Sequence, residues 1–385
     1  MYNKEQLNNL YERIAKAIDI SDDLFDAAET EYTDLGVWID KETPTYKISI
    51  YPQGSFALGT VIKPIKDNDD YDLDLVCEFE RQYGLSAKAL KHDVVKPLLE
   101  RYRKVKDKIV EKKRCWHVEY EDVPNFHMDI IPAIYQSTYI NITDHDEEKD
   151  LYNYIGSNPK GYVEWFNSRK AVRRKILVEQ YYAEHKQIVR CQADVEKLKE
   201  YNFKTPLQKA IQLLKRHRDI MFNGDADHRK PVSIIITTIA AQLYGNEDNI
   251  VDTLENIMGN AEQYIKDHMI EDEYHIDNPC YTGGDVENFA DKWNKHPERA
   301  NAFFEWLKKA KVDLIDNKLY NFVRVQMADN IKKSLGENTG IRVFNEIAEE
   351  ERKAIASQQA KIVTSTGAIS TSGSLPIPES HHHGA

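Results

Sequence analysis

Two aspartates at alternate positions of one apolar segment constrain the fold of this chain more than any other feature. Residues 71–79 read Tyr-Asp-Leu-Asp-Leu-Val-Cys-Glu-Phe, and this alternation predicts a β-strand. Side chains two positions apart on a strand share a face, so Asp72 and Asp74 project together while the apolar residues beside them enter the core. Adjacent carboxylates repel each other, and a divalent cation such as Mg²⁺ relieves that repulsion. Taken alone, the pair also fits a solvated strand face beside an acidic loop.

A third aspartate lies in a similar context farther along the chain. Residues 126–132 form another alternating, strand-like segment that contains a single acid, Asp129. If this strand pairs near the first one, Asp129 completes a cluster of three carboxylates. Three acids can hold two metal ions about 3.5–4 Å apart, an arrangement that clamps the attacking and leaving oxygens in phosphoryl transfer. On its own, Asp129 is better explained as an ordinary surface acid.

The dipeptide Gly54-Ser55 follows a predicted strand at 45–51 and precedes a predicted helical turn. Glycine lets the backbone approach a ligand closely, free N–H groups at a helix start bind phosphate, and the Ser55 hydroxyl adds a donor. A lone Gly-Ser pair is most often a simple turn. Because the Asp72-x-Asp74 strand comes next, the pair of motifs instead predicts a phosphate site beside a metal site.

The periodicity of the whole chain indicates an α+β first half joined to a helical second half. Further strands are expected at 116–120 and 126–131, joined by a turn at 122–125. The other expected helices are an opening one at 3–30, a mostly helical stretch at 88–109 with a boundary at Pro97, and segments at 159–183, 185–200, 205–222, 231–244, 249–267, 285–294, 297–311 and 315–333. We divide the chain into a catalytic core with its N-terminal helix at 1–155, a helical lobe completing the pocket at 156–350, and a flexible tail at 351–385.

Composition narrows the class of protein and its surroundings. The 385 residues are 41% hydrophobic and 30% charged, the balance of a soluble globular chain. The net charge of −12 argues against a protein that grips duplex nucleic acid, because phosphate backbones need a basic surface. Four scattered cysteines without a C-x-x-C pair are typical of a reducing compartment, and the longest nearly apolar stretch, 232–244, is too short to span a bilayer. We expect a cytoplasmic protein with no membrane partner and no stable contact with duplex DNA.

The order of these motifs resembles the polymerase-β nucleotidyltransferase superfamily. Within it, the fuller sequence is similar to the bacterial cGAS/DncV-like nucleotidyltransferases (CD-NTases), the signal synthases of CBASS anti-phage operons. The resemblance implies a small mixed sheet with helices, joined to a helical C-terminal lobe, with the active site in the cleft between them. One departure is a loop at 63–70 that lengthens the gap between Ser55 and Asp72. The matching stretches are 53–64, 70–76, 127–133, 157–162, 207–219, 230–241, 278–279 and 287–293.

The resemblance assigns roles to residues that periodicity alone leaves open. It implies that Gln53, together with Gly54 and Ser55, contacts the nucleotide, and that Lys215 and Ser233 contact its triphosphate. From the residues alone, Lys215 is better explained by a solvated basic stripe and Ser233 by an N-terminal cap. Asn278 and Asp285 lie where the family places its base-reading residues.

The activity implied by the resemblance is synthesis of a cyclic di- or trinucleotide from NTPs, ATP among them, with release of pyrophosphate. Two Mg²⁺ or Mn²⁺ ions would be held by Asp72, Asp74 and Asp129, and the product would act on a downstream effector. The chain ends in Gly384-Ala385, and family members often have a flexible tail whose terminal carboxylate is joined to targets by an E1/E2-type partner. Ala385 is therefore a candidate conjugation site, and an untethered end is the alternative.

Two other functions stay open from the sequence. The chain could transfer nucleotides to an RNA end or another acceptor, although its negative charge argues against this. It could also be a non-catalytic nucleotide sensor, although all three carboxylates are present. The base, ring size, linkage and activating signal are not specified by the sequence.

Several basic residues and one histidine are weaker candidates. The run 101–114 and the residues Arg169, Arg173 and Arg174 could approach phosphate, but solvated helix faces explain them better. His127 shares a strand face with Asp129 and could support the metal ligands, whereas a purely structural histidine is the simpler explanation.

Overall fold

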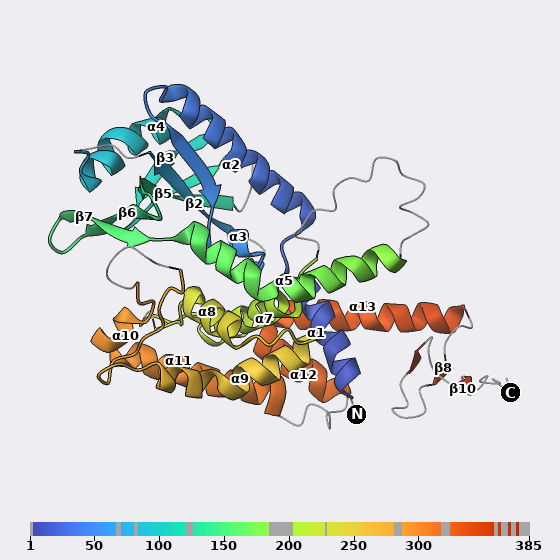
Figure 1. Cartoon of the computed structure of the whole chain (residues 1–385). Coiled ribbons are helices and arrows are strands. Elements are labelled where there is room, and N and C mark those ends of the chain that lie inside the picture. Colours follow the sequence, from blue (N-terminus) through green and yellow to red (C-terminus); the bar gives the residue numbers. More distant parts are fainter. Residues whose placement is uncertain are drawn as a thin grey trace.

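Two lobes make up the protein, a sheet lobe and a helical lobe, which meet along α5 (Pro159–Glu184) and α7 (Pro206–Met221) (Figure 1). The computed structural model describes residues 3–66, 71–80, 84–120, 126–184, 203–227, 229–280, 287–316 and 324–357, and three short strands after them. The expected helix at 185–200 and the expected turn at 122–125 lie outside the described residues, as do residues 67–70 of the loop at 63–70.

One mixed, seven-stranded sheet organises the first lobe. Its main path runs β1-β2-β5-β4-β3, and the hairpin of β6 and β7 extends from the far end of β5. The central pair, β2 and β5, is parallel, and all its other pairings are antiparallel. The strands are β1 (Ile48–Pro52), β2 (Tyr71–Phe79), β3 (Val105–Glu111), β4 (Trp116–Tyr120), β5 (Phe126–Gln136), β6 (Tyr139–Asp146) and β7 (Leu151–Ser157).

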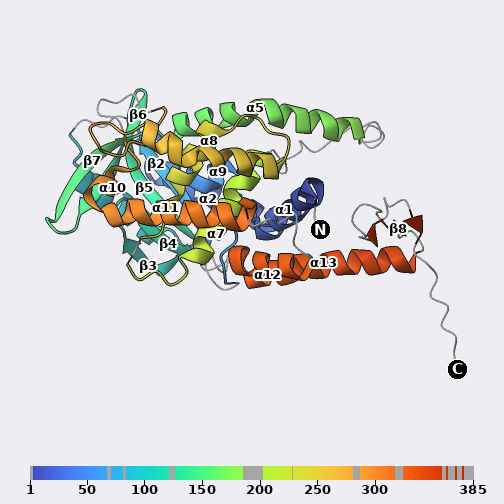
Figure 2. The same cartoon turned by 90° about the horizontal axis from the view of Figure 1, so that it is seen from below.

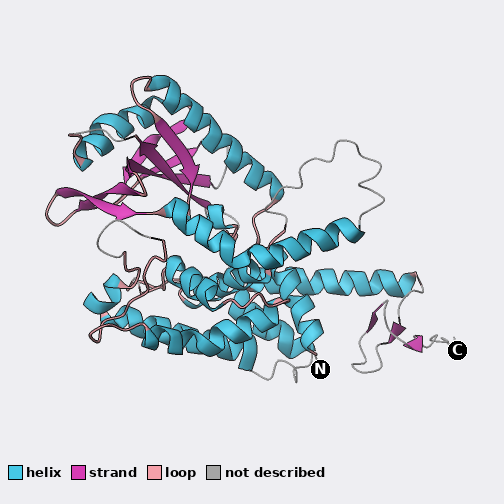
Figure 3. Ribbon diagram, in the orientation of Figure 1, coloured by secondary structure: helices cyan, strands magenta, loops and turns pink. Residues whose placement is uncertain are grey.

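Helices cover one face of this sheet and leave the carboxylate face toward the helical lobe. The long helix α2 (Asp22–Glu42) and the short helix α4 (Lys96–Arg101) bury apolar side chains against β2, β4 and β5 in a single core. A π-helical turn, Ala89–Val95, leads into α4, and Pro97 falls within the first turn of α4, as expected for a residue that lacks an N–H group. The strands are confined to the sheet lobe except for three short ones near the C-terminus, β8 (Lys361–Ile362), β9 (Ile369–Ser370) and β10 (Leu375–Pro376) (Figure 3).

The helical lobe packs around α7, whose N-terminus is well capped. Thr205 and Gln208 form a capping box, and Pro206 occupies the first helical position. The N-terminal helix α1 (Lys4–Ile18) packs into this lobe, because its buried residues share one core with α7 and α9. The other helices are α8 (Ser233–Leu243), α9 (Ile250–Asp267), α10 (Asp291–Lys295), α11 (Pro297–Lys311), the π-helical turn Val312–Asp316, α12 (Arg324–Leu335) and α13 (Glu337–Ala356). Seen from below, α5 and α13 extend beyond the body in the same direction (Figure 2).

The expectation of one opening helix over 3–30 was wrong. The first helix ends at Ile18, and Ser21 caps a second one by accepting a hydrogen bond from the Leu24 N–H group at 3.4 Å. A serine with extended backbone stabilises a helix start, so the chain turns here despite its continuous apolar spacing. This break places α1 in the helical lobe and α2 on the sheet.

Helix was also expected where the structure has β3, at the end of the 88–109 stretch. Charged residues dominate this segment, which gives it little intrinsic preference for a strand. It is a strand because it pairs antiparallel with β4, with an irregularity in the register after Val105. The β6–β7 hairpin and α13 were not expected at all, and the helix expected at 285–294 begins at Asp291 within the described part of the chain. Because α13 continues to Ala356, the first residues assigned to a flexible tail are helical.

Candidate active site

The register of two parallel strands brings the three predicted carboxylates together. Asp74 on β2 lies opposite Asp129 on β5, and Asp72 lies opposite His127. One carboxylate oxygen from each of Asp72, Asp74 and Asp129 falls within 4.8 Å of the others. The Asp72 side chain is 60% exposed and that of Asp129 is 22% exposed, so the cluster opens to solvent from the Asp72 side.

The electrostatics of the cluster match a cation site. Burial, followed by the charges of Asp72 and Asp129, raises the pKa of Asp74 to about 7. Three hard oxygen donors that repel one another are the ligand set that a divalent cation prefers and neutralises. The residues present therefore fit a divalent metal centre, as their spacing predicted.

Gly54 is positioned against this cluster by its backbone. It starts the short helix α3 (Gly54–Leu58) with φ 60°, a left-handed conformation that favours glycine. A Cβ atom at this position would stand 2.6 Å from Oδ2 of Asp74. The Gln53 N–H group also donates to the Asp74 carbonyl at 2.9 Å, which ties the turn to β2. The predicted Gly54-Ser55 turn thus lies directly beside the predicted carboxylates.

A row of donors on α7 holds the segment that follows this turn. The side chains lie at positions i, i+4, i+7 and i+8 of the helix, so they share one face. All are buried, and each donates to a backbone carbonyl of residues 58–64. The contacts are Gln208 Nε2 to Leu58 O (2.9 Å), Gln212 Nε2 to Val61 O (2.7 Å), Lys215 Nζ to Thr60 O (2.8 Å) and Arg216 Nη2 to Lys63 O (2.5 Å).

This set, which we call the α7 clamp, contains residues that sequence reasoning missed. Only Lys215 was singled out, and Gln208 and Gln212 were given no role. The sequence does contain a pattern that could have identified them. Amide and cationic side chains lie next to the apolar face of this helix, formed by Leu207, Ile211 and Leu214, where apolar residues are usual.

Lys215 itself lies within electrostatic reach of the carboxylates. It is buried, and burial followed by the nearby Arg218 charge lowers its pKa to about 7, while Asp74 and Asp72 act in the opposite direction. A lysine that is poorly solvated and close to the metal ligands is well placed to meet an incoming anion. In the described structure its Nζ atom donates to the Thr60 carbonyl.

Ser233 is the first residue of α8, and Val232 rather than Ser233 occupies the N-cap position. The Ser233 hydroxyl accepts a hydrogen bond from Nη1 of Arg218 at 2.7 Å. Arg218 is itself fixed by Asp219, whose carboxylate also accepts from Lys230 Nζ at 2.7 Å. These contacts tie the start of α8 to the end of α7.

Asn278 lies in the segment before α10, where its side chain is fully engaged. Its Nδ2 atom donates to Glu287 at 2.7 Å and its Oδ1 atom accepts from the Cys280 N–H group at 3.0 Å. These bonds tie Asn278 to both sides of its loop. Asp285 and Ala385 lie outside the described residues.

Two of the weaker basic candidates have structural partners. The Arg169 guanidinium donates to the Ala241, Gln242 and Tyr244 carbonyls at the C-terminal end of α8. Arg173 donates to the Asp248 carboxylate at 2.6 Å. Cations near the last carbonyls of a helix complement its dipole, so Arg169 stabilises the end of α8, whereas Arg173 fixes the loop that follows it.

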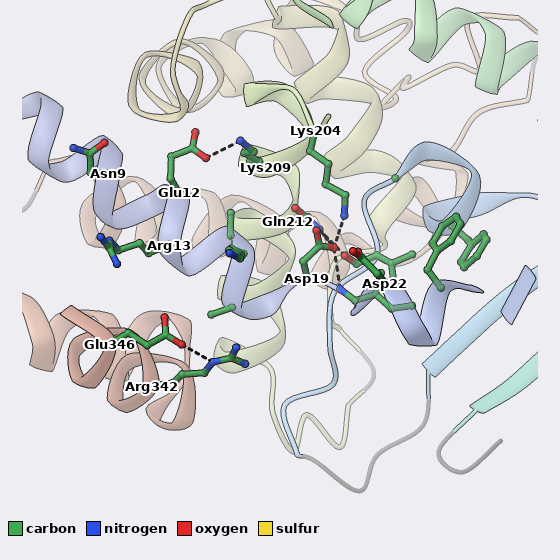
Figure 4. A pocket seen from close by; sticks show the side chains of 18 of the residues that line it. Asn9, Glu12, Arg13, Asp19, Asp22, Lys204, Lys209, Gln212, Arg342 and Glu346 are labelled. Carbon is green, nitrogen blue, oxygen red and sulfur yellow. Dashed lines mark hydrogen bonds and ion pairs between the residues drawn. The ribbon is translucent and has the colours of Figure 1, made fainter. Parts of the chain in front are cut away.

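A cavity of about 990 Å³ lies on the other side of the catalytic turn, between α1, α7 and α13 (Figure 4). Phe56, Gly59 and Val61 line one wall, but none of the three carboxylates does. Its charged side chains are mostly paired, across the walls in Lys209 with Glu12 and Arg13 with Glu350, and within α13 in Arg342 with Glu346. The cavity is therefore separate from the metal site.

Three carboxylates beside a glycine turn, with a second lobe fixed to that turn, suit the transfer of a nucleotidyl group and define a nucleotidyltransferase. Residues 48–135 match the family model described as "Cyclic GMP-AMP synthase DncV-like, nucleotidyltransferase domain". A c-di-GMP synthase of Roseivirga ehrenbergii is 31% identical over 314 residues, which cover 79% of this chain and 77% of that protein.

Solved structures have the same fold. The CD-NTase CdnG of Bradyrhizobium diazoefficiens, in complex with GTP, superposes with a TM-score of 0.69 at 21% identity, covering 88% of this chain and 98% of that one. The GTP-bound form of Vibrio cholerae DncV gives a TM-score of 0.52 at 15% identity, covering 87% of this chain and 80% of that one. The chain belongs to the DncV-like nucleotidyltransferases, the CD-NTases. It is an enzyme of the kind that makes cyclic oligonucleotides, which confirms the predicted family, fold class and reaction type.

No helix in the described part of the chain has both the length and the apolar character needed to cross a membrane.

Proposed function

We propose that this enzyme joins two NTPs, GTP among them, into a cyclic dinucleotide. The observation that carries this proposal is the convergence of Asp72, Asp74 and Asp129 beside Gly54, in a chain related to a c-di-GMP synthase over most of its length. GTP is also the ligand named for the CdnG structure that shares this fold. ATP, favoured by sequence reasoning alone, is the other candidate substrate.

The reaction forms one P–O bond and breaks another in each step. A ribose hydroxyl oxygen attacks the α-phosphorus of an NTP, the bond from the α-phosphorus to the bridging oxygen breaks, and pyrophosphate leaves with that electron pair. Asp129 helps to activate the hydroxyl. A second transfer within the linear dinucleotide closes the ring and releases a second pyrophosphate.

The carboxylates would hold two divalent ions, Mg²⁺ or Mn²⁺, since hard oxygen donors suit both. Such ions neutralise the triphosphate and lower the pKa of a nearby hydroxyl when they are bound. Gln53, Gly54 and Ser55 would place the phosphates from the sheet side, and Lys215 and Ser233 would approach from α7 and α8. On this proposal, these groups would meet in a cleft between the two lobes, as the family resemblance implies.

The test is incubation of the protein with each NTP mixture and Mg²⁺, followed by phosphatase treatment and mass spectrometry. A phosphatase-resistant cyclic dinucleotide is expected, and the double variant Asp72→Asn, Asp74→Asn should yield none. Product that persists in the double variant overturns the assignment. Lengthening of added tRNA or oligonucleotide, in place of a cyclic product, would establish the acceptor-modifying alternative, and NTP binding without any turnover would establish the sensor alternative.

The proposals for the tail and the cellular setting rest on the sequence resemblance. Ala385 would be conjugated by an E1/E2-type partner, and the cyclic product would act on an effector in the cytoplasm during anti-phage defence. Intact-mass analysis of the protein from cells that carry the conjugating proteins tests the first point. A terminus that stays unmodified there, and in cells challenged with phage, overturns it.

A further inference from the structure

Two histidines contact the carboxylates of the proposed metal site from the sheet itself. His117 lies on β4 directly opposite Asp129 in the antiparallel register, and its Nδ1 atom is 2.8 Å from Oδ1 of Asp129. His127 lies opposite Asp72 on the parallel neighbour, and its Nε2 atom is 3.3 Å from Oδ1 of Asp72. Sequence reasoning weighed only His127 and missed His117.

The two imidazoles form one unit beneath the carboxylates. Their ring centroids are 4.3 Å apart, and their side chains are only 19% (His117) and 16% (His127) exposed. Three neighbouring strands, β2, β5 and β4, therefore contribute one connected chain of side chains, from Asp72 through the two rings to Asp129. The rings are held by packing and the sheet register, so they offer the carboxylates a rigid support.

The chemistry of the contact fixes its direction. The Asp129 carboxylate accepts, so Nδ1 of His117 carries the proton and donates to it, whereas Nε2 of His127 makes an electrostatic contact with Oδ1 of Asp72 at 3.3 Å. The donation from His117 occupies one oxygen of Asp129 and leaves the other oxygen for a metal ion. Groups that hold metal-binding carboxylates by such hydrogen bonds change metal affinity roughly 10–100-fold when they are removed.

Exposure explains why this support is needed. The Asp72 side chain is 60% exposed, so surrounding atoms restrict its rotamers little, in contrast with Asp129 at 22%. A flexible ligand loses conformational entropy when it binds a metal, and a polar contact that holds it beforehand reduces that loss.

We infer that His117 and His127 are positioning residues that preorient Asp129 and Asp72 and so set the affinity of the enzyme for its divalent ion. This inference rests on the proposed function for the identity of the metal ligands. It goes beyond that function because it assigns a role to two residues to which the proposed function gives none.

The experiment compares removal of the donors with their replacement. His117→Leu and His127→Leu remove the donating nitrogen, whereas His117→Asn places an amide nitrogen near the former Nδ1 and His127→Gln places one near the former Nε2. Mn²⁺ binding to the nucleotide-free protein is measured by electron paramagnetic resonance. The leucine variants should bind Mn²⁺ about 10-fold more weakly or worse, and the amide variants should recover most of that loss.

His296→Leu is the matched control, since His296 also contacts a carboxylate, Glu298 at 3.4 Å, but lies at the start of α11. It should bind Mn²⁺ like the wild type. Thermal unfolding of every variant reports whether the fold is kept. In activity assays, the Mg²⁺ concentration at half-maximal rate should rise in the leucine variants while kcat at saturating Mg²⁺ changes little.

Folded leucine variants that bind Mn²⁺ as tightly as the wild type overturn the inference. Amide variants as weak as the leucine variants also overturn it, because they would assign the effect to ring packing. Wild-type protein that binds Mn²⁺ through its aspartates, loses it in the leucine variants, and yet makes no product from NTPs would overturn the proposed function and leave the positioning role in place.

Discussion

Gly54 and Asp74 are packed so closely that a single methyl group on Gly54 would stand 2.6 Å from a carboxylate oxygen of Asp74. The contact joins the Gly54-Ser55 turn directly to the carboxylate cluster. The positive φ of Gly54, 60°, adds a second reason why this position needs glycine.

Gly54→Ala should therefore reduce kcat strongly while the protein stays folded. The methyl group must displace Asp74 or the turn, and misplacement of reacting groups by about 1 Å can cost ~100-fold in rate. Steady-state product formation measures the loss, and thermal unfolding reports the stability change, about 1–2 kcal/mol from the backbone conformation.

Gly224→Ala is the matched control for this effect. Gly224 also has a positive φ, 86°, but a Cβ atom there would have no neighbour within 4 Å. The control should lose similar stability and keep its activity. Equal loss of kcat in both variants would show that backbone strain, rather than the contact with Asp74, is responsible.

Asp74 should also make the stability of the metal-free protein depend on pH. Its pKa is raised from 3.8 to about 7, so the folded state binds more protons than the unfolded state between about pH 4 and 7. The free energy of unfolding then falls as pH rises through this window, because ionisation is disfavoured in the fold.

The measurement is the Tm of wild-type protein and of Asp74→Asn in EDTA at pH 5, 6, 7 and 8. The wild-type Tm should fall relative to that of the variant as pH rises toward 8, and saturating Mg²⁺ should restore it only in the wild type. Parallel curves for the two proteins would contradict a raised pKa at Asp74.

The carboxylate site was predictable from sequence because its main elements are local. Alternation alone places Asp72 and Asp74 on one face of β2, and the Gly54-Ser55 turn precedes that strand by fewer than twenty residues. The prediction of Asp129 as the third carboxylate needed information beyond the local sequence. Its place beside Asp74 depends on the parallel pairing of β2 and β5, which no local pattern specifies. Family resemblance supplied that pairing.

Features that depend on long-range contacts were missed for the same reason. The strand register that sets His117 opposite Asp129 is invisible in the segment around His117, and the α7 clamp joins residues about 150 positions apart. The β3 segment was predicted wrongly as helix because its composition is rich in charged residues. Its strand conformation comes from antiparallel pairing with β4, which the segment's own sequence does not specify.

The α7 clamp predicts that Gln208→Ala damages the active site from the helical lobe. Gln208 donates to the buried Leu58 carbonyl at 2.9 Å, and an unsatisfied buried carbonyl costs about 1–3 kcal/mol. The free energy of unfolding should fall by that order, and the KM for NTP should rise because the turn after Ser55 loses a fixed contact.

Gln263→Ala serves as the control, since Gln263 is an exposed glutamine on α9 whose side chain donates to Asp267 one turn along the same helix. It should change stability by no more than about 0.5 kcal/mol. A Gln208→Ala protein with wild-type stability and wild-type KM would show that the clamp does not support the turn.

The last prediction concerns Lys215, whose pKa is lowered from 10.5 to about 7 by burial and by Arg218. As pH rises from 6.5 to 8.5 the folded protein loses this positive charge, so its attraction for a triphosphate weakens. NTP binding without metal, measured by calorimetry, should weaken several-fold over that range in the wild type. Lys215→Met should bind about 10-fold more weakly at pH 6.5, since hydrogen bonds to charged groups contribute about 1.5–3 kcal/mol, and should lose little more at pH 8.5.

Lys209→Met separates this role from a general effect of charge on α7. Lys209 lies on the same helix but faces the separate cavity and pairs with Glu12 at 2.6 Å. Its variant should keep both the affinity and the pH dependence of the wild type. If Lys215→Met keeps the wild-type pH dependence, the titrating group lies elsewhere, and the hydrogen bond from Lys215 to the Thr60 carbonyl is its whole contribution.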